Sequence, residues 1–130
     1  MPLTITPLYA ALAAVILLVL MFRVIRLRRS LSVGLGTGGH SALERAVRGH
    51  GNFTEYTPLG LILVASAELS GAAGHWVHAI GILLIVGRVL HPWGLAQSSG
   101  ASIGRVSGIL LTAAALLLGT GVNLFQFFGR

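Results

Sequence analysis

The chain contains no cysteine and no lysine, and only three of its 130 residues are acidic. Without cysteine there is no disulfide, no protein thiolate nucleophile and no cysteine-ligated metal, so any thiol chemistry must use the thiol of a substrate. Charged residues make up 9% of the sequence, against about 25% in an average soluble domain, and hydrophobic residues make up 55%. The composition excludes an ordinary soluble domain and indicates an integral membrane protein.

Two apolar segments are free of charge and long enough to cross a hydrocarbon core about 30 Å thick, Leu3–Phe22 and Val106–Phe128. Two further segments lie between them and include or meet ionisable residues, which we expect to face the inside of a helix bundle. The sequence therefore predicts one all-α domain over residues 1–130, an integral membrane four-helix bundle. Its expected spans are approximately 3–29, 42–69, 75–91 and 103–128.

All nine basic residues are arginines, and the formal net charge is +6. Their placement argues against nucleic acid as a partner, because eight of them end or follow the first span or flank the segment between the third and fourth spans. The positive-inside rule then places both termini outside and both arginine-bearing connections in the cytoplasm. The first apolar run has no basic residue before it, which favours an N-out anchor over a cleaved signal peptide. Lipid headgroups are an alternative partner for the arginines that end this run.

Three local patterns predict where helices start and stop. The glycine-rich stretch Val33–Ser41 lacks the GxxxxGK[ST] pattern and is interpreted as a linker rather than a phosphate cradle. Ser41 and Glu44 fit a capping box that starts a helix near Ala42, and Ser102 fits an N-cap for the last helix. In that last helix small residues recur at steps of three or four, which predicts close approach of another helix: Gly104, Gly108, Thr112, Ala115 and Gly119.

Polar residues gather where the second span begins. At 100° per residue, Glu44, Arg48, Asn52 and Glu55 fall within about 80° of one another on one helix face. One interpretation is a solvated face or a polar cluster between helices, with an ion pair between Glu44 and Arg48. The other is a site for a polar, partly anionic molecule, in which arginine binds carboxylate and the amide and carboxylate side chains bind amide and amine groups.

The stretch "ERAVRGHGNFTEYTP", Glu44–Pro58, resembles the signature of the MAPEG family, membrane-associated proteins of eicosanoid and glutathione metabolism. In that family an E-R-x-x-R-x-x-x-N-x-x-E-x-x-P pattern opens the second of four transmembrane helices. The arginines ending the first span, "GRVLH" in the third and an arginine opening the fourth agree with the family layout. The resemblance implies a homotrimer in a bacterial inner membrane that binds glutathione as co-substrate between subunits near the cytoplasmic face.

The resemblance also implies roles for particular residues. Arg105 corresponds to the arginine that holds the glutathione sulfur as a thiolate, so it is the expected catalytic residue. The expected glutathione contacts are Arg48, His50, Asn52, Glu55 and Tyr56, with Arg28 or Arg29 from the end of the first helix.

Elementary electrostatics supports the role of Arg105 independently. A cation in the first turn of a helix is disfavoured by the macrodipole by about 0.3–1 kcal/mol, and an anion at the same place would reverse that sign. A thiol, whose ordinary pKa is near 8.5, would ionise more readily there. The alternative is that Arg105 extends to lipid phosphates.

One departure from the family concerns eicosanoid chemistry. Eicosanoid-processing members carry an aromatic hydroxyl just after the third-helix motif, and this chain has Leu95 in its place. Carry-over of eicosanoid synthase activity is therefore not expected. His91 is a candidate to replace the aromatic hydroxyl as proton donor and to contact bound glutathione. A histidine at the end of a helix is, however, also a common cap or interface residue.

Three functions follow from these observations. The first is a glutathione-dependent transferase or peroxidase that acts on lipophilic electrophiles delivered by the membrane. The second is a lipid-binding scaffold without catalysis, and the third is a small proton-coupled exporter that would depend on Glu68. Since an intramembrane carboxylate needs a partner, we expect Glu68 to pair with His75 or His78 across the short loop between the second and third spans.

Overall fold

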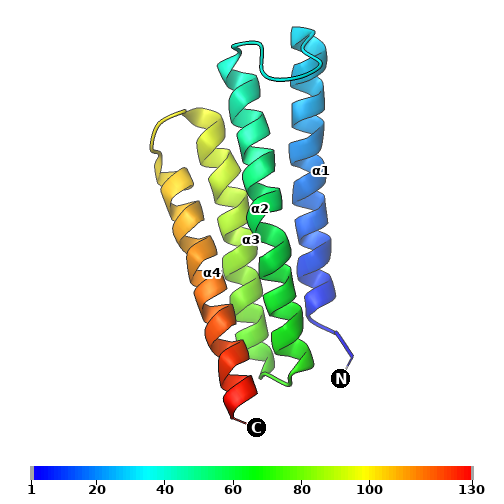
Figure 1. The fold of residues 1–130 in the computed structure, drawn as a ribbon, viewed down its shortest axis with the longest axis vertical. Helices are drawn as coiled ribbons and strands as arrows, with labels where there is room; N and C mark the ends of the chain where they lie inside the picture. The colour runs from blue at the N-terminus through cyan, green and yellow to red at the C-terminus, as the bar shows by residue number, and fades with distance from the viewer. Residues whose placement is uncertain (1, 130) are drawn as a thin grey trace.

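The computed structural model describes residues 2–129, which form four helices and no strand (Figure 1). They are α1 (Thr6–Leu31), α2 (Ser41–Leu69), α3 (Gly74–Gln97) and α4 (Ile103–Phe128). The connector between α1 and α2 and the loop between α3 and α4 lie at one end of the bundle. Both termini and the short α2–α3 turn lie at the other end. The predicted all-α class is confirmed, and the two arginine-bearing connections share one end as the charge distribution requires.

The helices are not arranged as a closed ring. Among the described residues α1 packs on α2 and α3, α4 packs on the same two helices, and α1 does not touch α4. By length and composition α1, α3 and α4 can each cross a membrane, whereas the more polar α2 does not meet the same criterion. Three candidate spans are thus shown, and the crossing of α2 stays a prediction.

The small-residue stripe of α4 is confirmed as a packing surface, because its five members are the residues that α4 buries. A Cβ atom added to Gly108 would lie 2.5 Å from the backbone nitrogen of His91, and one added to Gly87 would lie 2.9 Å from the carbonyl oxygen of Gly108. Neither position therefore has room for a side chain. The backbones of α3 and α4 approach one another as closely as small-residue interfaces allow.

The helix continues beyond the predicted third span of approximately 75–91, since α3 runs through Pro92 to Gln97. Proline removes one helical hydrogen bond and favours a break, but neighbouring helices can stabilise a helix that passes through it. Pro92 is buried, and a Cβ atom added to Gly49 of α2 would lie 3.4 Å from its side chain. Packing against α2 and α4 therefore outweighs the local preference, and the extra turn carries Leu95 over the polar end of α2.

One of the two predicted caps is present. Ser102 precedes α4, and its hydroxyl accepts a hydrogen bond from the Arg105 backbone nitrogen at 3.3 Å. At the start of α2 the expected capping box is absent: Ser41 is already helical, His40 holds the cap position, and no side chain caps the helix. The backbone nitrogen of Glu44 donates to the His40 carbonyl at 3.0 Å instead, so the helix starts one residue earlier than the box requires.

The expected pairing of Glu68 with a histidine is also wrong. Its carboxylate accepts hydrogen bonds from the backbone nitrogens of Thr4, Ile5 and Thr6 at 2.5, 2.6 and 2.7 Å, and from both threonine hydroxyls. It therefore caps the start of α1 from the end of α2, satisfying donors that a helix N-terminus leaves unpaired. His78 pairs with Tyr9 instead, whose hydroxyl lies 2.7 Å from Nδ1.

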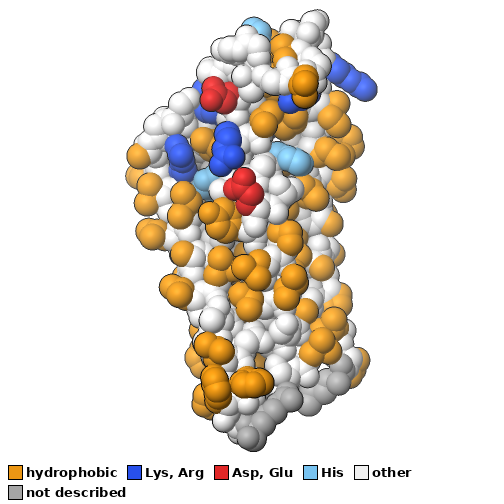
Figure 2. Space-filling view, in the orientation of Figure 1, with side chains coloured by type: hydrophobic (Ala, Val, Ile, Leu, Met, Phe, Trp, Pro, Cys, Tyr) orange, Lys and Arg blue, Asp and Glu red, His pale blue; other side chains and the backbone are white. Residues whose placement is uncertain are grey.

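The surface divides into two zones (Figure 2). Arginine, glutamate and histidine side chains gather at the connector end, while hydrophobic side chains dominate the rest of the face shown. Large apolar side chains stay exposed along the helices, among them Phe22 of α1 and Leu117 of α4. Exposed apolar surface on long helices suits contact with lipid tails, and the polar end suits a headgroup region. The chain is an integral membrane protein.

Candidate functional site at the polar end of the bundle

A cavity of about 260 Å³ opens between α2, α3, α4 and the loop that joins the last two. The polar face of α2, the last two turns of α3 and the first turns of α4 each contribute lining residues. The lining residues are Glu44, Arg45, Arg48, Asn52, His91, Leu95, Ser99, Arg105 and Ile109. The additional turn of α3 beyond Pro92 contributes directly, because it places Leu95 in the cavity.

The cavity is positively charged, since its lining includes three arginines and one glutamate. Two of these arginines are held at the rim by the α3–α4 loop. Arg45 donates from Nη1 to the Ser99 hydroxyl at 3.1 Å, and Arg105 donates from Nη1 to the carbonyl oxygens of Ser99 and Gly100 at 3.1 and 3.3 Å. Neither arginine forms an ion pair within residues 2–129, so both charges remain available to an anion.

His91 lines the same cavity and is only 4% exposed. Its Nδ1 atom is buried and has no hydrogen-bond partner among the described residues, and the same holds for Nε of Arg45. Buried polar atoms in folded proteins are nearly always paired, because an unpaired one costs about 1–3 kcal/mol. Both atoms belong to residues that line the cavity, but each atom is itself shielded from solvent, so this cost arises in the protein beside the cavity.

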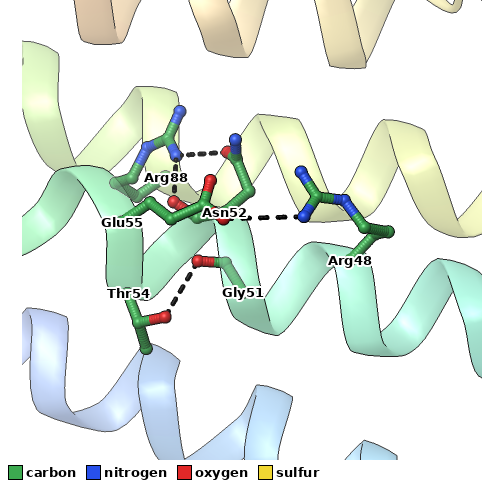
Figure 3. Close-up of polar contacts among 6 residues, drawn as sticks. All are labelled: Arg48, Gly51, Asn52, Thr54, Glu55 and Arg88. Carbon is green, nitrogen blue, oxygen red and sulfur yellow. Dashed lines mark hydrogen bonds and ion pairs between the residues drawn. The ribbon is translucent and has the colours of Figure 1, made fainter. Parts of the chain in front are cut away.

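Arg48 pairs with Glu55, with Nη1 and Oε1 separated by 3.5 Å (Figure 3). The expected pair of Arg48 with Glu44 is not formed among the ion pairs of the described residues. The side chains of Arg48 and Glu55 are 61% and 51% exposed, so this contact contributes at most a few tenths of a kcal/mol. A ligand carboxylate could replace Glu55 at Arg48 at little cost.

Arg88 is a site residue that the sequence did not reveal. It is 1% exposed and joins three helices: Nη1 donates to Asn52 Oδ1 at 2.7 Å, while Nε and Nη2 donate to the Thr112 hydroxyl at 2.9 and 2.6 Å. Its guanidinium carbon lies 5.6 Å from the centre of the Tyr56 ring. The sequence predicted that ionisable residues of the middle spans face the bundle interior, but it gave Arg88 no role in the site.

A second cavity of about 230 Å³ lies beside Arg88 and shares two lining residues, Asn52 and Ile109, with the first. Tyr56, Arg88 and Thr112 form its polar part, and Ala113 and Leu116 contribute to its apolar part. The polar cavity at the end of the bundle is therefore adjacent to a more apolar one further along α4.

The structure brings together some of the predicted site residues and separates others. Arg48, Asn52, His91 and Arg105 line the first cavity, Glu55 lies beside it through its ion pair, and Tyr56 lines the second cavity. The remaining three do not line either cavity. Arg28 donates to connector carbonyls, at 2.9 Å for that of Gly36, Arg29 lines an open groove on α1, and His50 is half-buried on α2.

The helix order, the arginine-lined cavity and the Glu44–Pro58 pattern together define a class of membrane protein. The model of the MAPEG family matches residues 6–125, and the chain belongs to that family. Among characterised sequences it is 40% identical over 121 residues to "Inner membrane protein YecN" of Escherichia coli strain K12, covering 93% of this chain and 91% of the relative. The protein of that name from Escherichia coli O6:H1 strain CFT073 matches to the same extent.

Proposed function

We propose that the protein is a glutathione-dependent membrane transferase or peroxidase that acts on lipophilic electrophiles. Glutathione has a carboxylate at each end, a free amine and a central thiol. The cavity offers complementary groups: arginines on two walls for carboxylates and Glu44 for an amine. The observation that carries the proposal is the convergence of Arg48 and Arg105, from separate helices, on one cavity that His91 also lines.

In this proposal Arg105 is the catalytic residue. It lies in the first turn of α4, where the helix dipole already favours an anion, and its guanidinium adds a full positive charge. Both effects favour the thiolate over the thiol, and the thiolate is the nucleophile. In a transferase reaction the sulfur forms a bond to an electrophilic carbon of the substrate, while the electron pair of the broken bond leaves with the departing atom. In this proposal His91, which lines the same cavity, supplies a proton to that atom.

Assembly would complete the site. The cavity of one chain, about 260 Å³, is at the lower limit of ligand sites, which typically measure about 300–1,000 Å³. A tripeptide would extend beyond it, so we propose that a neighbouring copy in a homotrimer covers the rest. We also propose a bacterial inner membrane with the termini outside and the cavity on the cytoplasmic side. The shared end of the two arginine-bearing connections and the inner-membrane name of the relative support this arrangement.

Calorimetric titration of glutathione into the detergent-solubilised protein tests the binding step. Arg48→Gln and Arg105→Gln should each weaken binding about tenfold or more, because each removes a charged hydrogen bond of about 1.5–3 kcal/mol. Arg23→Gln is the matched control, because Arg23 lines the groove on α1 away from the cavity. Thiolate formation, followed by ultraviolet absorbance, should be lost in Arg105→Gln. Normal thiolate formation in that variant, or no binding by the wild type, would contradict the proposal.

A second candidate, a lipid-binding scaffold without catalysis, is favoured by one observation. Leu95 is buried against the cavity where eicosanoid-processing relatives would place an aromatic hydroxyl, so this position supplies no proton. A protein that binds a fluorescent lipid analogue but shows no glutathione-dependent thermal shift would match this second function. Conjugation of a lipophilic aryl halide by the purified protein would exclude it.

A further inference from the structure

Arg88 is the most deeply buried charged side chain that the structure describes. No acidic side chain pairs with it within residues 2–129. Instead it donates to an amide oxygen, a hydroxyl and, at 3.5 Å, the Gly108 carbonyl. A buried cation without a carboxylate is costly to keep in a membrane protein. Its burial between three helices, next to the candidate site, indicates a role in that site.

The contact with Asn52 fixes the orientation of that amide. A guanidinium group only donates hydrogen bonds, so the atom of Asn52 that faces Nη1 at 2.7 Å must be Oδ1 (Figure 3). Arg88 cannot turn away, because Thr112 accepts from its other edge and the Tyr56 ring lies over its carbon. The amide of Asn52 therefore has one orientation, with its NH2 group directed away from Arg88.

That NH2 group is available to a ligand. Asn52 lines both cavities, and its Nδ2 atom donates to no protein group among the described residues. With its oxygen held by Arg88, Asn52 presents its NH2 donors to the ligand. Since Arg48 on the same helix face also only donates, these two side chains together suit a carboxylate or a carbonyl oxygen of a ligand.

We propose that Arg88 is a positioning residue that sets the specificity of the cavity: it holds Asn52 so that its NH2 group binds a carboxylate or carbonyl oxygen of the ligand. The inference rests on the proposed function, because it takes glutathione as that ligand. Arg88 itself does not contact glutathione in this arrangement and acts through Asn52.

Asn52→Asp separates this role from a merely structural one. Aspartate has the shape of asparagine, and its carboxylate can pair with Arg88, so we expect the thermal stability in detergent to be kept or raised by a few degrees. The same change replaces the donors with an acceptor, so the affinity for glutathione should fall about tenfold or more. If Arg88 and Asn52 only stabilised the fold, a variant that stays stable would also keep its affinity for glutathione. Glutathione affinity within about twofold of the wild type would overturn the inference.

A spectroscopic test observes the amide directly. The chain contains two asparagines, Asn52 and Asn123, and the second donates to the Leu63 and Gly119 carbonyls in the other half of the bundle. In protein labelled with 15N only at asparagine, glutathione should shift the side-chain NH2 signals of Asn52 and leave those of Asn123 unchanged. Arg88→Lys keeps the charge but cannot hold Asn52 and Thr112 together, so it should shift the Asn52 signals before any glutathione is added.

The outcomes distinguish the two proposals. If calorimetry shows no glutathione binding to the wild type, the proposed function fails and this inference fails with it. If glutathione binds but the Asn52 signals do not respond, or if Arg88→Lys leaves them unchanged, the inference alone is overturned. Binding with a response at Asn52 and a displaced signal in Arg88→Lys supports both.

Discussion

Replacing Glu68 with glutamine should destabilise the bundle far more than an equivalent change at the surface. The carboxylate accepts three backbone hydrogen bonds at 2.5–2.7 Å and two hydroxyl hydrogen bonds at 2.6 and 3.0 Å, all from Thr4, Ile5 and Thr6. Oε2 receives the bonds from Thr6, and Oε1 receives the other three. Glutamine keeps one oxygen and places an NH2 group against donors on the other side.

The magnitude follows from what is lost. At least one backbone N–H at the start of α1 is left without an acceptor, at a cost of about 1–3 kcal/mol, and the remaining bonds lose their charge assistance. Removal of a negative charge at a helix N-terminus lowers the free energy of unfolding by a further amount of about 0.3–1 kcal/mol. We expect Glu68→Gln to lower the free energy of unfolding by about 3 kcal/mol.

Unfolding in mixed micelles of mild detergent and dodecyl sulfate, followed by circular dichroism, measures this difference. Glu55→Gln is the matched control: it is the same change on the same helix, but its side chain is 51% exposed and forms only the weak ion pair with Arg48. The control should lose less than about 0.5 kcal/mol. If Glu68→Gln unfolds within error of Glu55→Gln, the carboxylate does not cap α1 and the reasoning is refuted.

Three further substitutions test the packing and the connections. Gly108→Val should lower the free energy of unfolding by about 2–3 kcal/mol in the same assay, because there is no room for a side chain between α4 and α3. Gly121→Val on the same helix is the control: a Cβ atom there has no neighbour within 4 Å, so the loss should be under about 1 kcal/mol. Tyr9→Phe should cost about 1 kcal/mol in that assay because His78 loses its partner, and no loss would contradict the contact. Arg28→Gln should speed limited proteolysis of the α1–α2 connector without changing global unfolding, because Arg28 holds connector carbonyls.

Local patterns predicted the features that depend on neighbours in the chain. Steps of three and four between small residues identified the buried face of α4, since helical periodicity alone places them in a row. Ser102 was identified as a cap because its hydroxyl needs only the helix that follows it. The grouping of Arg48 and Asn52 on one face of α2 was likewise a matter of helical spacing.

Features that depend on distant parts of the chain could not be predicted. The hydrogen-bond partners of Glu68 lie 62–64 residues away along the chain. The histidines close to it in sequence were the wrong choice, because the unpaired backbone N–H groups at the start of α1 bind the carboxylate instead. The continuation of α3 through Pro92 depends on its packing against α2 and α4, which overrides the local preference of proline. Arg88 was overlooked as a site residue because its acceptors come from α2 and α4, 36 and 24 positions away.

The small-residue stripe of α4 also bears on the proposed assembly of several copies of the chain. Its small residues are all covered by helices of the same protomer, so they have no free surface to offer another molecule. In the proposed homotrimer, contacts between copies would therefore use bulkier, outward-facing side chains such as Leu110 and Leu117 of α4 or Leu59 of α2. Folding of the individual chain and the proposed assembly would thus use different sides of the same helices. Mutations can impair one of these properties while leaving the other intact.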